Sequence, residues 1–198
     1  GRSQPDMSSG HRTDESIIEL FFERSEDAIQ WTMDKYGALL RKLAWNILED
    51  AEDVEECLSD TYLAIWNAIP PERPLYLKAY LCRIARNFAL DRVKEKMRSK
   101  RGGGQAHLLL DELSETLASG ANTVRDLETA EIGGVISGYL RCQPDQRRVI
   151  FVQRYFYASG LREIAEEHNM TEGAVKALLH RMRIELKGVF EREGYGDE

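Results

Sequence analysis

Residues 161–186, LREIAEEHNMTEGAVKALLHRMRIEL, contain two helical patterns separated by a short polar turn. The first pattern covers residues 161–167, and the second begins at Thr171, whose hydroxyl can accept a hydrogen bond from an early backbone N–H. Asn169 lies in the turn, where similar motifs usually place glycine, and asparagine tolerates a left-handed backbone better than most residues. The stretch therefore predicts a helix-turn-helix.

The second helix of this motif has two distinct faces. Apolar residues recur at helical spacing on the inward face, and Ile164 and Ala165 supply the contact from the preceding helix. These inward residues are Val175, Leu179, Met182 and Leu186. The outward stripe gathers side chains that can reach bases and phosphates in a major groove. It comprises Glu172, Lys176, His180, Arg183 and Lys187, with Arg181 on its flank. The alternative is an amphipathic hairpin with a solvated basic face.

Three further helices are predicted in the first hundred residues. The first has an apolar stripe of Ile29, Met33, Tyr36, Leu40, Leu43 and Ile47. The second has Val54, Leu58, Thr61 and Ile65, and Pro70 and Pro71 end it. The third buries Leu77, Leu81, Ile84 and Phe88. Sharing one apolar seam, the three helices would form a bundle.

The chain is expected to be all-α, with two small helical domains joined by a flexible acidic linker. The domains cover residues 16–100 and 127–192, after a disordered tail over 1–15 that starts with an expression scar. The linker, 101–126, is rich in glycine and acidic residues, although 107–113 could form a short docked helix. In the second domain a proline-started helix has Val149, Ile150, Val152 and Phe156 as candidates for burial.

The third predicted helix continues into a strongly basic stretch. Residues 80–101 hold eight basic residues and two acidic ones, in a chain whose net charge is −7. One polar stripe, which could lie along a nucleic-acid backbone while the Asn87 amide bonds a base edge, comprises Arg83, Asn87, Lys94 and Arg98. Tyr76 and Tyr80 could stack on an unpaired base, or they could pack into the bundle. A merely solvated basic surface is the alternative.

Residues 49–60, EDAEDVEECLSD, hold seven carboxylates and no cation. Glu49, Asp53, Glu56 and Asp60 share one helical face, which favours a solvated surface or a docking site for a basic protein partner. No ExxH motif accompanies them, so we expect neither a metal site nor any other cofactor.

Cys57, Cys82 and Cys142 lie in apolar helical patterns without ligand spacing, which predicts reduced, buried thiols. No apolar run approaches the roughly 18 residues that span a bilayer, and no signal pattern is present, so we expect a cytoplasmic protein without membrane insertion.

Three segments together resemble bacterial RNA polymerase sigma factors of the extracytoplasmic-function (ECF) group. They are DAEDVEECLSDTYLAIWNAI, YLKAYLCRIARNFALDRVKEK and the helix-turn-helix LREIAEEHNMTEGAVKALLHRMRIEL. The resemblance covers about residues 16–100 and 127–192, which would be sigma regions 2 and 4. It implies a non-enzymatic protein that binds core RNA polymerase, directs it to promoters and helps to melt the minus-10 element.

The resemblance also implies roles for individual residues. In the first domain, minus-10 DNA would be bound by Arg83, Arg86, Asn87, Arg92 and Lys94, and the loop 68–76 would capture a flipped base. Asp53, Glu56 and Asp60 would dock on the clamp helices of the largest polymerase subunit. In the second domain the minus-35 element would be bound by Thr171, Glu172, Gly173, Lys176, His180, Arg181 and Arg183. An anti-sigma factor is a further expected partner.

Other classes of protein fit the sequence less well. A helix-turn-helix regulator that acts without being a polymerase subunit would need a sensing domain, and the first hundred residues show no strand–helix alternation. A helical adaptor would leave both basic stripes as solvated surface. A nuclease using the acidic helix lacks a second set of ligands. Because a net acidic chain repels DNA at long range, we expect weak promoter binding by the chain alone.

Overall fold

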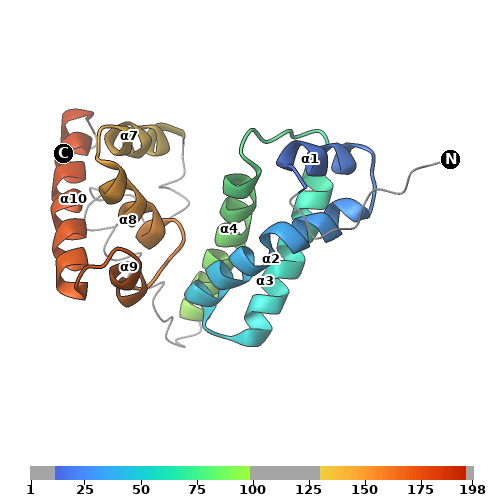
Figure 1. The fold of residues 1–198 in the computed structure, drawn as a ribbon, viewed down its shortest axis with the longest axis horizontal. Helices are drawn as coiled ribbons and strands as arrows, with labels where there is room; N and C mark the ends of the chain where they lie inside the picture. The colour runs from blue at the N-terminus through green and yellow to red at the C-terminus, as the bar shows by residue number, and fades with distance from the viewer. Residues whose placement is uncertain (1–11, 99–129, 195–198) are drawn as a thin grey trace.

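The computed structural model describes residues 12–98 and 130–194 of the chain. Within these ranges the chain is helical and contains no strand (Figure 1). The N-terminal domain consists of α1 (Asp14–Phe22), α2 (Asp27–Leu48), α3 (Ala51–Ala68) and α4 (Leu77–Arg98). The C-terminal domain consists of α7 (Ala130–Arg141), α8 (Asp145–Tyr155), α9 (Leu161–Glu167) and α10 (Glu172–Arg192). The predicted all-α class and its two helical domains are confirmed, while the linker 101–126, with the segment 107–113, lies outside the described residues.

Side-chain caps and prolines set several helix ends where the sequence predicts them. The Asp50 carboxylate accepts a hydrogen bond from the Asp53 N–H at 2.9 Å and starts α3, which ends at Ala68, just before Pro70. The Thr171 hydroxyl accepts one from the Ala174 N–H at 3.1 Å and starts α10, as predicted.

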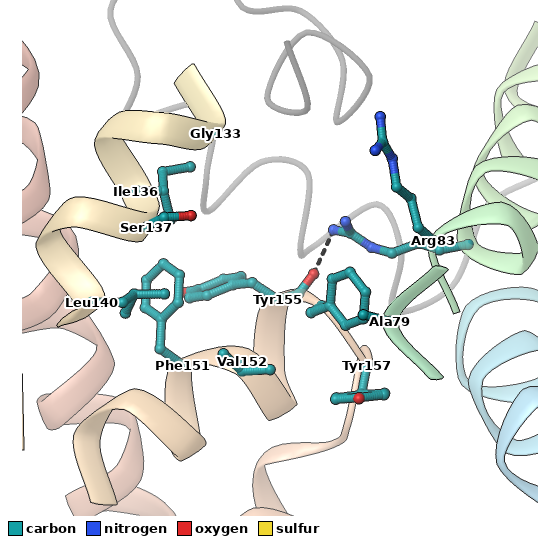
Figure 2. Close-up of a pocket in the computed structure, with 12 residues that line it drawn as sticks. Ala79, Arg83, Gly133, Ile136, Ser137, Leu140, Phe151, Val152, Tyr155 and Tyr157 are labelled. Carbon is teal, nitrogen blue, oxygen red and sulfur yellow. Dashed lines mark hydrogen bonds between the residues drawn. The ribbon is translucent and has the colours of Figure 1, made fainter. Parts of the chain in front are cut away.

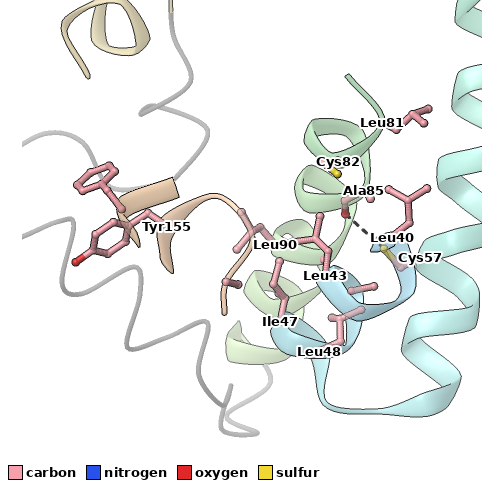
Figure 3. Packing of buried hydrophobic residues seen from close by; sticks show 14 of the residues in the cluster. Leu40, Leu43, Ile47, Leu48, Cys57, Leu81, Cys82, Ala85, Leu90 and Tyr155 are labelled. Atoms are coloured by element: carbon pink, nitrogen blue, oxygen red, sulfur yellow. Dashed lines mark hydrogen bonds between the residues drawn. The ribbon is translucent and has the colours of Figure 1, made fainter. Parts of the chain in front are cut away.

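The core of the N-terminal domain lies between α2, α3 and α4, where Leu40, Leu43, Leu81 and Ala85 pack together (Figure 3). The predicted α3 stripe is fully buried, whereas the first part of the α2 stripe is not, since Met33 is 44% exposed. In α4 the buried face passes through alanines, and the larger Ile84 and Phe88 lie half-buried at its edge. Small side chains allow closer helix approach, which explains this rotation of the predicted face.

Helix α1 was not predicted from the sequence. Thr13 caps it, and Ile17 and Phe21 are fully buried. The Asp14 carboxylate accepts hydrogen bonds from Lys35 Nζ at 2.7 Å and Tyr36 Oη at 2.6 Å, which ties α1 to α2. Burial alone would raise the pKa of Asp14, but these two hydrogen bonds outweigh it and hold the pKa below its usual value. The helix begins two residues before the expected start of the domain.

In the C-terminal domain the predicted inward face of α10 is confirmed. Val175, Leu179, Met182 and Leu186 are all buried, together with Ile164 and Ala165 of α9. The prediction for α8 was partly wrong. Ile150 is buried, but Val149 is 45% exposed, and the ring pair of Phe151 and Tyr155, with centroids 4.7 Å apart, occupies the core instead.

Asn169 has a φ of 52°, so the turn between α9 and α10 does use the left-handed conformation expected there. We predict that Asn169→Ala lowers the free energy of unfolding of the C-terminal domain by about 1 kcal/mol, because a β-carbon without a compensating side-chain contact is disfavoured in this region. Asn169→Gly, the matched control, should be nearly neutral. Hydrogen exchange of the α9 and α10 amides measures both, and equal protection in the two variants would contradict the prediction.

Two of the three cysteines match the expectation of buried thiols. Burial raises the pKa of Cys57 and of Cys82 to about 11, so both thiols stay protonated at neutral pH. Cys142 is exposed at the end of α7, where the chain turns towards α8, and the predicted burial was wrong there. No helix in the part of the chain that the structure describes is long and apolar enough to cross a membrane.

Candidate nucleic-acid interface

Helix α10 presents most of its predicted DNA-binding residues to solvent. The exposed positions are Thr171, Glu172, Gly173, Lys176, His180, Arg181 and Lys187. Arg183 differs, because it is half-buried and its Nη1 donates a hydrogen bond to the Tyr155 hydroxyl at 2.7 Å. The N-terminal half of α10 thus has exposed basic residues on one side and buried apolar residues on the other.

Polar contacts from the other helices hold α10 in place. The Tyr139 hydroxyl of α7 donates a hydrogen bond to the Glu185 carboxylate at 2.5 Å, and Arg147 of α8 approaches the same carboxylate at 3.4 Å. The hydrogen bond from Tyr139 lowers the pKa of Glu185 more than burial raises it, so the carboxylate stays charged. These contacts orient the exposed face of α10.

Helix α4 presents a second cationic surface, but its residues are not equally accessible. Arg83 is exposed, and Asn87 and Lys94 are half-exposed. Arg86 is only 8% exposed, and its Nη2 donates a hydrogen bond to the Tyr155 backbone carbonyl of α8. The sequence did not predict this contact. Every residue has a backbone carbonyl, so a pattern of residue types cannot indicate which carbonyl will accept a hydrogen bond.

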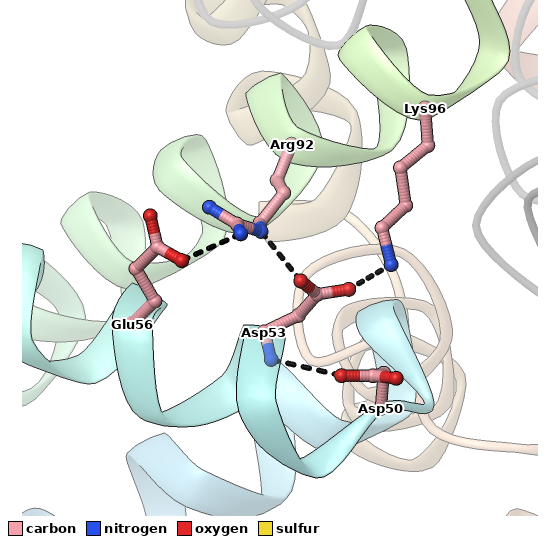
Figure 4. A network of polar contacts seen from close by, with 5 residues as sticks. All are labelled: Asp50, Asp53, Glu56, Arg92 and Lys96. Atoms are coloured by element: carbon pink, nitrogen blue, oxygen red, sulfur yellow. Dashed lines mark hydrogen bonds and ion pairs between the residues drawn. The ribbon is translucent and has the colours of Figure 1, made fainter. Parts of the chain in front are cut away.

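The remaining arginine predicted to bind DNA, Arg92, is committed to contacts inside the N-terminal domain (Figure 4). Its Nε donates to Asp53 at 2.8 Å and its Nη2 to Glu56 at 2.6 Å, and the hydrogen bond to Glu56 raises the pKa of Arg92. Lys96 donates to the other oxygen of Asp53. Asp53 and Arg92 therefore join α3 to α4. The binding of polymerase by Asp53 and of DNA by Arg92 stays a prediction.

The rest of the predicted polymerase-binding face is open to solvent. Glu56 and Asp60 are exposed on α3, whereas Asp53 is only 6% exposed. Among the residues that the structure describes, acidic, histidine and cysteine side chains form no cluster of three that could hold a metal ion.

The two tyrosines that could stack on a base differ in exposure: Tyr76 is the last residue of the loop between α3 and α4, and Tyr80 lies in the first turn of α4. Tyr76 is 78% exposed. Tyr80 is half-buried against the bundle and donates a hydrogen bond to Glu72, so it takes the packed alternative. Arg24 Nη1 donates to the Trp66 and Ile69 carbonyls at 2.8 and 3.0 Å, which fixes the start of the loop.

The fold and its charged faces define a class: an all-helical, two-domain protein with a helix-turn-helix and a basic helix packed on an acidic one. The sigma-70 region 2 family model matches residues 32–99, and the sigma-70 region 4 model matches residues 144–186.

Two relatives from Bacillus subtilis (strain 168) are similar over most of the chain. The ECF RNA polymerase sigma factor SigW is 24% identical over 168 residues, which cover 82% of this chain and 88% of SigW. The ECF RNA polymerase sigma factor SigM is 25% identical over 153 residues, which cover 77% of this chain and 88% of SigM. The chain therefore belongs to the sigma-70 family of RNA polymerase sigma factors, in its ECF group. As a sigma factor it directs RNA polymerase to promoters, and membership of this family supports a non-enzymatic role.

Proposed function

We propose that this sigma factor binds core RNA polymerase through the acidic surface of α3, the minus-10 element through α4 and the minus-35 element through α10. The observation that carries the proposal is the pair of solvent-facing cationic surfaces on separate domains of an acidic chain. Clustered cations suit phosphate contact, and the remaining negative surface suits a basic protein partner.

The arrangement of α10 supports contact with the minus-35 element. Lys176, His180 and Arg181 stand exposed on its first turns, and the inward face is fully engaged with the domain core. A recognition helix inserts its N-terminal residues into the major groove, where lysine and arginine reach guanine and the phosphates.

The exposed side of α4 and the adjacent loop support a role in melting. Asn87 can bond a base edge, Arg83 can bind a phosphate, and exposed Tyr76 offers a surface on which an unpaired base can stack. Unstacking one base costs a few kcal/mol, which such contacts can offset. Polymerase docking would use the exposed Glu56 and Asp60 on the clamp helices of the largest subunit, while Asp53 holds α3 against α4.

The proposed partners also include an anti-sigma factor, and the proposed location is the cytoplasm. Both rest on the resemblance to ECF sigma factors.

Run-off transcription with purified core polymerase tests this function, on a promoter selected from a genomic library with the unchanged chain. We predict that Asn87→Ala lowers transcription about fivefold or more, because a lost base-edge contact costs about 1–3 kcal/mol. The same variant should transcribe almost normally from a template already melted at the minus-10 element.

Gln30→Ala is the matched control, since this exposed amide lies in α2, a helix that carries none of the residues assigned to DNA or polymerase. Equal defects of Asn87→Ala on the duplex and the pre-melted templates would contradict a role in opening. Normal transcription by Asn87→Ala on the duplex would remove the residue from the site.

A further inference from the structure

The tip of the loop between α3 and α4 carries apolar side chains that face solvent. Leu75 is 92% exposed and Tyr76 is 78% exposed. A cavity of about 500 Å³ lies further along the chain, where Ala79 and Arg83 of α4 line it together with residues of α7 and α8 (Figure 2). None of the described residues that line this cavity lies between 70 and 76. The tip is therefore open, and an unpaired base can reach it.

Pro70 leaves one of the last carbonyls of α3 without its usual partner. In a continuing α-helix the Trp66 carbonyl would accept a hydrogen bond from the N–H of residue 70, but proline has no N–H. Arg24 supplies the missing donor, because its Nη1 donates to the Trp66 carbonyl at 2.8 Å and to the Ile69 carbonyl at 3.0 Å. The guanidinium also lies over the Trp66 ring, 3.7 Å from its centroid. One side chain thus holds both the end of α3 and the first residue of the loop.

The middle of the loop is anchored to α1 as well. Arg73 donates to Glu19 at an Nη1–Oε1 distance of 2.6 Å, and its guanidinium lies 4.2 Å from the centroid of the Phe22 ring. The end of α1 is itself fixed by the buried Phe21, whose ring centroid lies 6.2 Å from that of Trp66. The last turn of α1 and the turn that follows it therefore support the loop at its start and its middle, while the tip stays exposed.

We propose that Arg24 is a positioning residue for promoter melting: it holds the loop in the shape that captures a flipped base and acts through the loop rather than by contact with DNA. This positioning role rests on the proposed function of the loop. Arg24 has a φ of 56°, and a non-glycine residue keeps such a left-handed backbone only where its surroundings impose it. A loop already in its binding shape needs no further ordering when a base enters, which strengthens capture.

Arg24→Gly tests this role, because glycine adopts the left-handed backbone without strain, so the turn between α1 and α2 is kept while the guanidinium is lost. Kinetics of open-complex formation with core polymerase, on the promoter selected with the unchanged chain, separate the affinity of the initial complex from the rate constant of opening. The rate constant should fall about three- to tenfold, since each capture must then order the loop, and the affinity should change less than about twofold. A merely destabilised domain would instead lower the fraction of active chain and leave the rate constant unchanged, which would overturn the proposal.

Arg12→Ala is the matched control for the lost charge and the lost ring contact. The Arg12 guanidinium lies over the Trp31 ring, 4.9 Å from its centroid, just before the start of α1 and therefore at the opposite end of this helix from Arg24. The variant should open the promoter at the unchanged rate. A defect of Arg12→Ala equal to that of Arg24→Gly would mean that only net charge matters, and the positioning role would then be wrong.

Tyr76→Ala separates a failure of the positioning role from a failure of the loop's proposed function. It removes the exposed ring at the tip and reports whether the loop contributes to opening. Slow opening by Tyr76→Ala together with normal opening by Arg24→Gly would overturn the positioning role alone. Normal opening by both variants would remove the loop from the proposed site, and the positioning role with it.

Discussion

Asp53→Ala is expected to lower the free energy of unfolding of the N-terminal domain by about 2 kcal/mol. The Asp53 carboxylate is nearly buried and accepts hydrogen bonds from both Arg92 and Lys96. Its removal therefore takes a negatively charged partner away from two cations of α4. Asp53 also lies in the first turn of α3, where a negative charge interacts favourably with the helix N-terminus.

The expected size follows from the accessibility of the three side chains. Breaking a fully buried ion pair by removing one partner costs about 3–5 kcal/mol. Here 27% of the Arg92 side chain and 39% of the Lys96 side chain remain accessible, so water and Glu56 replace part of the lost interaction. Screening by solvent therefore reduces the effect without removing it.

Urea unfolding followed by tryptophan fluorescence measures this change in the full chain. All three tryptophans, Trp31, Trp45 and Trp66, lie in α2 and α3, so the signal reports the N-terminal domain. Glu55→Ala is the matched control, because it removes a carboxylate of the same helix whose pair with Arg41 is more than half exposed. Its expected cost is small, because solvent and side-chain entropy offset most of the attraction in an exposed ion pair. A cost for Asp53→Ala no larger than that of Glu55→Ala would show that the network does not stabilise the domain.

The sequence predicts elements well where one residue pattern fixes both the helix and its buried face. In α10, four apolar residues at helical spacing follow a capping threonine, and all of them are buried as expected. In α4 the prediction favoured Ile84 and Phe88, but alanines line the closest contact with the neighbouring helices. Periodicity weights large side chains, whereas helix packing depends on which face allows close approach.

Contacts between distant segments account for most of what the sequence did not predict. Helix α1 has only nine residues, too few for a distinctive stripe, and it is held mainly by its packing on α2. Arg92 lies in a basic stretch and Asp53 in an acidic one, so each was expected to contact another molecule. Opposite charges on the adjacent helices α3 and α4 instead pair with each other inside the domain. Only the tertiary structure shows which charged residues still face solvent.

The largest functional effect is expected from removing two exposed cations of α10 together. Lys176→Ala combined with Arg181→Ala should lower run-off transcription from a promoter with a minus-35 element by at least about tenfold, since one lost base contact alone costs about 1–3 kcal/mol. Both side chains are exposed above buried Val175 and Leu179, so stability should change little. Circular dichroism melting checks that the variant remains folded.

A control variant that removes one other cation of α10, together with the salt dependence of binding, separates specific recognition of the minus-35 element from general electrostatic attraction to DNA. Arg192→Ala removes an exposed cation from the last turn of the same helix and should reduce transcription less than twofold, because it lies far from the N-terminal half of α10. If Lys176 and Arg181 bind phosphates, the double variant should also show a shallower dependence of polymerase–promoter affinity on salt concentration, by roughly one counterion for each lost contact. A defect equal to that of Arg192→Ala would mean that α10 contributes only net charge, and the assignment of its face to the minus-35 element would then be wrong.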